Sequence, residues 1–455
     1  MMEILLQHTP LLYLTQSLWR DEAFSILTAE RPLLSVLGKL TFEPPVYYTL
    51  LHFWMKIFGN SEIATRSLSF VAFALATIIV VFWAEKLYGK HWLSWYTPIF
   101  FFLNPMLLYY AFEVRTYGLY ILFATLAIYA YSQKHWRLYA LGVILGFYTH
   151  TYLIIVPLVT TIHYVLYDVQ KLIKQRRFKS ITADSFLRVT LLIGLAIAPW
   201  LIRIIGVSSK LKQSWYFPVD TNLITSVLGN MFLGYEGTPW YLWQYTAYLS
   251  AILLLFFLYA IKKSPLRTFT AYMAMMITIP LAFVIGISFI KPLFVNRYLL
   301  CVTIAEVFLL TAAIQAIKKE FLKRLSAGAL LAGIIVFNSW YPKEHRKVNL
   351  RETFRIVNAL RKPSEPIYAA SSLIYFESMY YTPDRQNVYL YNPDGSSFPW
   401  FVGDAIFDPS RNVADLPTYP KQAFIIHENG TFETAYRTET QATSIENPPA
   451  IQRRP

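Results

Sequence analysis

Charged side chains are scarce in this sequence. Asp, Glu, Lys and Arg together make up 15% of its 455 residues, whereas soluble domains carry roughly 25%. Hydrophobic residues account for 55%, and apolar runs such as 69–84, 191–202 and 248–261 approach the roughly 20 residues that cross a bilayer. The shortage of charge excludes an ordinary water-soluble domain, and we expect a polytopic membrane protein.

Cysteine is almost absent, since Cys301 is the only one. A single cysteine excludes a disulfide framework within the chain and a metal site built from cysteines. The N-terminal residues lack a charged region, a clean apolar stretch and a cleavage site in that order, so we expect no cleaved signal peptide. The net charge of +14 is typical of the basic cytoplasmic loops of membrane proteins, and we expect no nucleic acid partner.

About eleven segments are predicted to cross the membrane. Their approximate ranges are 3–18, 66–84, 93–111, 116–132, 138–150, 151–167, 187–205, 242–261, 269–290, 298–316 and 325–341. If residue 1 is cytoplasmic, every cluster of Lys and Arg between these segments falls on the cytoplasmic side, as the positive-inside rule requires. The acidic loop 19–65 and everything after residue 341 then face the outside. The predicted fold class is mainly α and polytopic.

The composition changes after residue 341, where apolar runs give way to short mixed segments. Apolar spacing predicts a helix over 350–361, and β-rich runs predict strands over 366–372, 387–391 and 422–428. We therefore predict a transmembrane domain over 1–341 and a small extracytoplasmic α/β domain over 342–428. The polar, proline-containing remainder, 429–455, is expected to be a disordered tail.

Two neighbouring carboxylates, Asp21 and Glu22, stand in the first predicted outer loop. An ionised group near a membrane boundary must be hydrated or paired, so such groups are often functional. Two adjacent carboxyls can supply an ionised base and a partner that orients it or a cation. The alternative is a pair of solvated loop acids. An acidic pair permits a divalent metal without requiring one, and we assign no metal ligand.

The segment 41–70 contains a Pro-Pro pair followed by an aromatic, amphipathic stretch, which indicates an interfacial helix. Several short motifs follow one another between residues 19 and 300. They are Trp19-Arg20-Asp21-Glu22-Ala23, Pro44-Pro45-Val46-Tyr47-Tyr48, Phe58-Gly59-Asn60-Ser61-Glu62 with Arg66, FEVRTYGL (112–119), THTYL (149–153) and NRYLL (296–300).

In this order the motifs resemble those of the GT-C superfamily of membrane glycosyltransferases. The resemblance is to the family that contains protein O-mannosyltransferases, aminoarabinose transferases and RgtA-like bacterial relatives. It implies a GT-C fold and transfer of a sugar, with inversion, from a polyprenyl-phosphate donor. The acceptor would be a lipid, a glycan or a protein at the outer face of the cell membrane, among membrane lipids.

By this resemblance Asp21 is the catalytic base and Glu22 supports it or orients a metal. The leaving phosphate develops negative charge, which arginine stabilises well, and Arg115 and Arg297 stand at outer span ends. Each arginine could instead snorkel to lipid headgroups. The other candidate substrate contacts are Glu113, Glu43, Tyr47, His150 and Tyr298.

One position departs from the family pattern, because Glu43 stands before the Pro-Pro pair where relatives often carry a basic residue. A phosphate contact therefore does not carry over to this position. For Glu113 and His150 the alternative is a purely structural role.

A membrane transporter or flippase of envelope precursors is the alternative function. Such proteins tend to carry ionisable groups near the bilayer midplane, whereas these spans are nearly free of acids. An O-antigen polymerase or ligase is a third possibility, since it would also act on a lipid-linked sugar at the membrane.

Overall fold

The computed structural model describes residues 8–40, 43–170, 184–207, 219–234 and 240–438. The chain divides into two compact units. The first unit comprises residues 1–15 and 33–345, and the second comprises residues 16–32 and 346–455. The segment that carries Asp21 and Glu22 therefore belongs to the same unit as the C-terminal residues.

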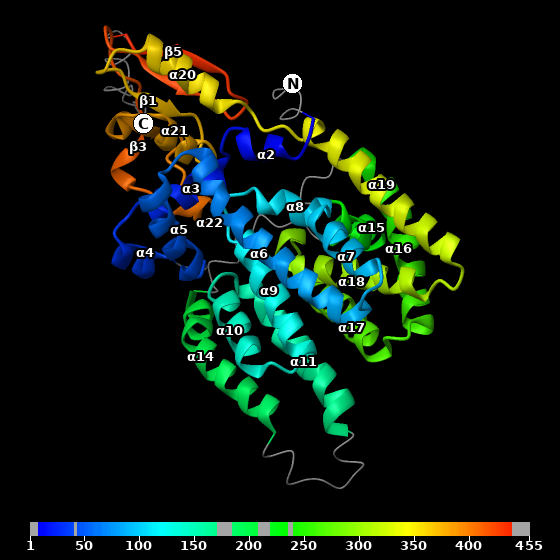
Figure 1. Cartoon of the computed structure of the whole chain (residues 1–455). Coiled ribbons are helices and arrows are strands. Elements are labelled where there is room, and N and C mark those ends of the chain that lie inside the picture. Colours follow the sequence, from blue (N-terminus) through cyan, green and yellow to red (C-terminus); the bar gives the residue numbers. More distant parts are fainter. Residues whose placement is uncertain (1–7, 41–42, 171–183, 208–218, 235–239, 439–455) are drawn as a thin grey trace, which may run out of the picture. The chain divides into compact units, whose positions relative to one another are not determined.

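The first unit is helical throughout its described residues (Figure 1). Its α-helices are α2 (Leu11–Thr15), α4 (Leu33–Lys39), α5 (Pro45–Phe58), α6 (Glu62–Tyr88), α7 (Leu93–Phe102), α8 (Pro105–Ala111), α9 (Tyr117–Ser132), α10 (Trp136–Phe147), α11 (Ile155–Tyr164), α14 (Ser185–Val207), α15 (Thr221–Phe232), α16 (Trp243–Lys263), α17 (Arg267–Ser288), α18 (Leu300–Ala316) and α19 (Glu320–Glu344). Short turns of other helix types are η1 (Thr151–Ile154), η2 (Val165–Val169), η4 (Trp240–Leu242) and η5 (Asn296–Leu299).

Six helical segments within the described residues are long and apolar enough to cross a membrane. They are Glu62–Tyr88, Thr151–Val169, Ser185–Gly206, Trp243–Lys263, Arg267–Ser288 and Asn296–Ala316. Helices α9 and α10 are apolar but shorter. The prediction of a mainly helical, polytopic membrane protein is confirmed.

Two predicted spans differ from the structure in detail. The segment 93–111 is two helices, because Asn104 ends the first and Pro105 begins the second; the Asn104 side chain accepts the Leu107 N–H at 3.1 Å. Of the segment 3–18, residues 3–7 lie outside the described residues, and α2 accounts for only five of the rest.

Helix α18 is the centre of the first unit. Its apolar window is 89% buried inside the protein, whereas that of α14 is 17% buried. Helices α7, α9, α16 and α17 pack around α18, and Thr303 donates a hydrogen bond to the Met231 carbonyl at 2.7 Å. A span buried to this extent packs against protein on all sides, while the apolar surface of α14 is suited to contact lipid.

Helices α6 and α9 are in close contact at Gly118. A Cβ built on Gly118 would lie 2.5 Å from the Ser69 carbonyl oxygen and 2.7 Å from the Ser69 Cα, both backbone atoms of α6. The Ser69 hydroxyl also donates a hydrogen bond to the Arg115 carbonyl at 3.2 Å. Only glycine fits this contact, and the contact fixes the start of α9, where Arg115 and Tyr117 stand.

Gly118→Val is therefore expected to separate α6 from α9 and to lower the stability of the first unit by about 1–3 kcal/mol. Gly194→Val is the matched control, since a Cβ on Gly194, in the lipid-suited helix α14, meets no atom within 4 Å. Thermal unfolding of both variants in detergent compares the two. Equal melting temperatures would contradict the close approach of the helices.

The predicted loop 19–65 is largely helical. It holds α3 (Arg20–Ala29), α4 and α5. The prediction of a loop is therefore wrong for α3 and α4, whereas α5 lies in the segment for which an interfacial helix is predicted. Helix α3 starts at Arg20 because Glu22, in its first turn, accepts the Trp19 backbone N–H at 3.3 Å. Helix α5 begins with Pro45 in its first turn, as the Pro-Pro pair predicts.

The second unit contains a five-stranded sheet with helices (Figure 1). Its further elements are α20 (Leu350–Leu360), β1 (Ile367–Ala369), α21 (Tyr375–Tyr381), η6 (Arg385–Asn387), β2 (Val388–Tyr391), α22 (Trp400–Gly403), η7 (Pro409–Arg411), β3 (Asn412–Val413), β4 (Ala423–Ile426) and β5 (Phe432–Ala435). The strand order is β3-β2-β1-β4-β5, with parallel pairs except for the antiparallel β4–β5 pair. The predicted helix over 350–361 and the three predicted strands are confirmed as α20, β1, β2 and β4.

Residues 432–435, predicted to lie in a disordered tail, form β5 instead. The β4–β5 pair places Phe424 opposite Thr434 and Ile426 opposite Phe432, and the turn between them has Gly430 at a positive φ of 80°. The hairpin is therefore specified by its turn and by pairing with the buried strand β4, not by the composition of β5. Residues 439–455 of the predicted tail lie outside the described residues.

Candidate active site

The predicted site residues fall into two sets, one in each unit. Asp21 and Glu22 belong to the second unit, in the first turn of α3, where the helix dipole favours negative charge. Asp21 is 8% exposed, and Arg20 Nε lies 2.9 Å from Asp21 Oδ1. The guanidinium of Arg20 also lies 5.9 Å from the Trp19 ring centroid. Asp21 is thus a buried, oriented carboxylate and not a solvated loop acid.

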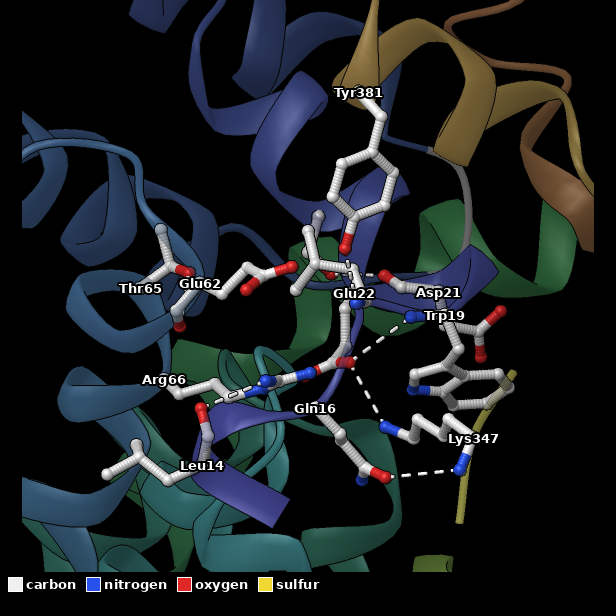
Figure 2. A network of polar contacts seen from close by, with 12 residues as sticks. Leu14, Gln16, Trp19, Asp21, Glu22, Glu62, Thr65, Arg66, Lys347 and Tyr381 are labelled. Atoms are coloured by element: carbon white, nitrogen blue, oxygen red, sulfur yellow. Dashed lines mark hydrogen bonds and ion pairs between the residues drawn. The ribbon is translucent and has the colours of Figure 1, made fainter. Parts of the chain in front are cut away.

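Glu22 is fully buried and holds the N-terminus of α3 to the C-terminal residues. Its Oε2 lies 3.1 Å from Lys347 Nζ, and the same oxygen accepts the Trp19 N–H (Figure 2). Gln16 Oε1 accepts the Lys347 backbone N–H at 3.2 Å, and Tyr381 Oη accepts the Leu18 N–H at 2.7 Å. These contacts assign Glu22 a supporting role for the helix that carries Asp21.

The first unit brings Arg115 and Arg297 to one tyrosine. The guanidinium carbons lie 6.0 Å and 5.9 Å from the centroid of the Tyr117 ring, and Arg297 is also 5.7 Å from the Tyr298 ring. Both arginines are buried, at 9% and 7% exposure. The two buried guanidinium groups near one ring supply N–H donors that are suited to bind a phosphate or another anion. Snorkelling arginines would lie in water or among headgroups instead.

His150 lies in the turn between α10 and η1, outside both helices. Its ring is stacked on Tyr120, with centroids 5.0 Å apart at 11°, and lies 5.0 Å from the Tyr298 ring. Burial, together with the charges of Arg115 and Arg297, lowers the pKa of His150 to about 3. The imidazole is therefore neutral at physiological pH and can accept or donate a hydrogen bond at this site without adding charge.

Glu43 provides the carboxylate at this site. Its Oε1 lies 3.1 Å from Arg115 Nη2, and it accepts a hydrogen bond from the Tyr48 hydroxyl. Tyr47 is fully buried beside Tyr48, with ring centroids 5.5 Å apart. Glu43 is thus the counter-ion of Arg115.

The remaining motif residues divide between site and scaffold. Glu113 is buried, at 2% exposure, in the turn before α9, and its charge acts on Tyr117. Ser61 caps α6 by accepting the Ala64 N–H at 3.4 Å, which is a structural role. Arg66 is fully buried and donates a hydrogen bond to the Leu14 carbonyl at 3.0 Å (Figure 2).

Three further residues interact with members of these two sets and were not singled out from the sequence. Tyr117 lies within the FEVRTYGL motif, and the guanidinium groups of Arg115 and Arg297 both lie over its ring. Lys347 is one of several basic residues after α19, and nothing in its neighbourhood marks it as the partner of Glu22. Glu377 lies in α21, and burial raises its pKa to about 8, although the charge of Arg20 opposes the increase.

Among the described residues, no three His, Cys, Asp or Glu side chains form a group that could hold a metal ion. Asp21 pairs with Arg20, and Glu22 pairs with Lys347. The described side chains therefore compensate these two carboxylates with cations of the protein itself.

No family model and no curated protein matches the chain. The fold is similar to that of ArnT from Cupriavidus metallidurans in the apo state, at 12% identity and a TM-score of 0.60, over 91% of each chain. The structure of the same protein bound to undecaprenyl phosphate gives a TM-score of 0.62 at 12% identity, over 92% of this chain and 91% of ArnT. Identity this low establishes the fold alone.

The chain is thus a polytopic membrane protein with the GT-C fold that the motif resemblance implied. The likeness to ArnT extends over both the helical unit and the small α/β unit, since it covers more than nine-tenths of the chain.

The raised pKa of Glu377 predicts a pH dependence of stability. In the folded protein this carboxyl keeps its proton up to about pH 8, whereas in the unfolded chain it loses it near its usual value of 4.5. The folded state therefore holds more protons between these values, and stability falls as pH rises, by at most about 1.4 kcal/mol per pH unit.

Glu377→Gln is expected to remove this loss of stability, which thermal unfolding in detergent between about pH 5 and pH 8 measures. Glu365→Gln is the control, because Glu365 is equally buried but accepts the Lys362 N–H at 2.8 Å. If the two variants show the same pH dependence as the wild type, Glu377 is not protonated in the folded protein.

Proposed function

We propose that the chain is an integral membrane glycosyltransferase. It transfers a sugar from a polyprenyl-phosphate donor to a hydroxyl group of a lipid, glycan or protein acceptor at the extracytoplasmic face. The observation that carries the proposal is the pair of buried arginines, Arg115 and Arg297, on the Tyr117 ring. The fold supports it, since the similar protein ArnT has been crystallised with undecaprenyl phosphate.

In the proposed reaction Asp21 is the general base. It takes the proton of the acceptor hydroxyl while that oxygen attacks the anomeric carbon from the side opposite the phosphate. The new glycosidic C–O bond forms as the bond to phosphate oxygen breaks, so the configuration inverts. The leaving group is the polyprenyl phosphate, and its developing charge is stabilised by guanidinium groups that are already oriented.

Each proposed role follows from a local environment. The short side chain of Asp21 is buried and is paired with Arg20, and both features hold its carboxylate in one orientation. Arg115 and Arg297 contact the phosphate, and Glu43 is displaced from Arg115 when the phosphate arrives. Neutral His150, with Tyr298, Tyr47 and Glu113, completes the donor surface in this proposal.

The alternative is a transporter or flippase of envelope precursors. One observation favours it, since Glu306 is fully buried in the span α18 and neither of its carboxyl oxygens has a hydrogen-bond partner among the described residues. Buried acids in spans are frequent in transport proteins. Glu306 stands alone, however, whereas the buried ion pairs and ring-bound arginines described above are all outside the six span segments or at their ends.

Asp21→Asn is expected to lower the rate of sugar transfer from a polyprenyl-phosphate donor by about 10²- to 10⁴-fold, because it removes the base and keeps the side-chain size. Asp408→Asn is the control, since its side chain is 59% exposed in the same unit. The assay uses the purified protein in lipid vesicles. Full activity of Asp21→Asn would exclude Asp21 as the base, and solute uptake without a transfer product would favour the transporter.

Arg297→Gln is expected to raise the KM for the donor by about 10- to 100-fold, since a hydrogen bond to a charged group contributes about 1.5–3 kcal/mol and 1.4 kcal/mol corresponds to tenfold. Arg188→Gln, at an exposed position of α14, is the control and should leave the KM unchanged. An unaltered KM in Arg297→Gln would contradict a phosphate contact.

A further inference from the structure

One buried carboxyl of the second unit has no part in the proposed reaction. Glu377 lies in α21 and is 5% exposed. Helix α21 packs against α3, where the Phe376 and Phe24 rings meet edge to face with centroids 5.5 Å apart. Gly403 packs directly against both rings. A Cβ built on Gly403 would lie 2.4 Å from a ring atom of Phe24, which is too close for any other residue to fit without a shift. The place of Glu377 relative to α3 is thus fixed by packing within one unit.

The charges that act on Glu377 come mainly from α3. Arg20 attracts its carboxylate form, whereas Asp21 and Glu428 repel it. Besides α3, the elements that contact α21 are α20, β1, β2 and, at Gly403, α22, which has no charged residue. The charged residues of α20 are exposed, and the titratable residues of the two strands are tyrosines. The charge of Arg20 therefore acts on both carboxyls, through a direct contact with Asp21 and through a longer-range attraction on Glu377.

Only one of the two carboxyls has a contact with Arg20 at hydrogen-bond distance. Arg20 Nε lies 2.9 Å from Asp21 Oδ1, while Glu377 Oε2 has no hydrogen-bond partner among the described residues. A buried, incompletely satisfied carboxyl is stable as the neutral acid and costly as the anion. Burial accordingly raises the pKa of Glu377 to about 8. At neutral pH the uncharged Glu377 does not compete with Asp21 for the guanidinium of Arg20.

We propose that Glu377 is a positioning residue that acts on Asp21 through Arg20. While Glu377 is protonated, Arg20 holds the Asp21 carboxylate in a single orientation. When Glu377 loses its proton, the new anion draws the guanidinium away, and Asp21 loses that orientation. This inference rests on the proposed role of Asp21 as the base. Its consequence is a rate of transfer that falls on the alkaline side while donor binding is unchanged.

The test is the pH profile of kcat and of KM for a polyprenyl-phosphate sugar, from about pH 6 to about pH 10, with the full-length protein in vesicles. We expect kcat of the wild type to fall by about tenfold per pH unit above about pH 8, the pKa of Glu377, as for one ionising group. Glu377→Gln mimics the neutral acid, so its kcat should match the wild type within about twofold near pH 7 and should not fall at higher pH.

Two further variants complete the profile. Glu377→Asp keeps a titrating group and should keep an alkaline fall in kcat. Glu365→Gln removes a different buried carboxyl and should behave like the wild type. The proposal is overturned if Glu377→Gln shows the same alkaline fall as the wild type, or if only the KM changes.

A measurement without turnover separates this inference from the function of Asp21. Infrared difference spectra of the wild type should show a protonated carboxyl band at neutral pH that disappears with a midpoint near 8 and is missing in Glu377→Gln. Asp21→Asn removes a repelling charge and should move the midpoint to lower pH, whereas Arg20→Gln should move it to higher pH. Midpoints that do not move in Asp21→Asn and Arg20→Gln would refute the coupling, even if Glu377→Gln does not fold. If the midpoints move but Asp21→Asn is still active in sugar transfer, only the role of Asp21 as the base is refuted.

Discussion

A charge that is withdrawn from water must be compensated, and this constraint governs both sets of residues described above. Asp21, Glu22, Arg115 and Arg297 are each less than one-tenth exposed. In the second unit, Arg20 and Lys347 compensate the two carboxylates. In the first unit, tyrosine rings and the carboxylate of Glu43 compensate the arginines. Each buried charge is thereby held in one direction, as chemistry on an ionic substrate requires.

The two units compensate buried charge in different ways. In the second unit the cations of Arg20 and Lys347 pair with the two carboxylates and orient them. In the first unit, the guanidinium groups of Arg115 and Arg297 lie over the Tyr117 ring. A cation–π contact does not occupy the N–H groups of a guanidinium, so these can still bind an anion. A hydrogen bond from a guanidinium group to a phosphate is charge-assisted and therefore strong. For this reason the proposed function gives the phosphate of the donor to these two arginines.

Much of the helical unit could be predicted from the sequence, because long apolar runs and the Pro-Pro pair act locally. The candidate residues Arg115, Arg297, His150 and Tyr298 were found through short motifs, and they meet around Tyr117. The partner of Glu22 could not be predicted, because Lys347 is 325 positions away. The helix α3 was missed although its capping contact between Glu22 and the Trp19 N–H is local, and β5 was missed because its partner strand specifies it.

The central claim is that this protein transfers a sugar from a lipid-linked donor. Mass spectrometry of envelope glycolipids and glycans tests it most directly, with cells that lack the protein compared with cells that carry the wild type. The account predicts loss of one glycosylated product and accumulation of a polyprenyl-phosphate sugar, neither reversed by the Asp21→Asn variant. Identical glycolipid and glycan profiles in the two kinds of cells would contradict it.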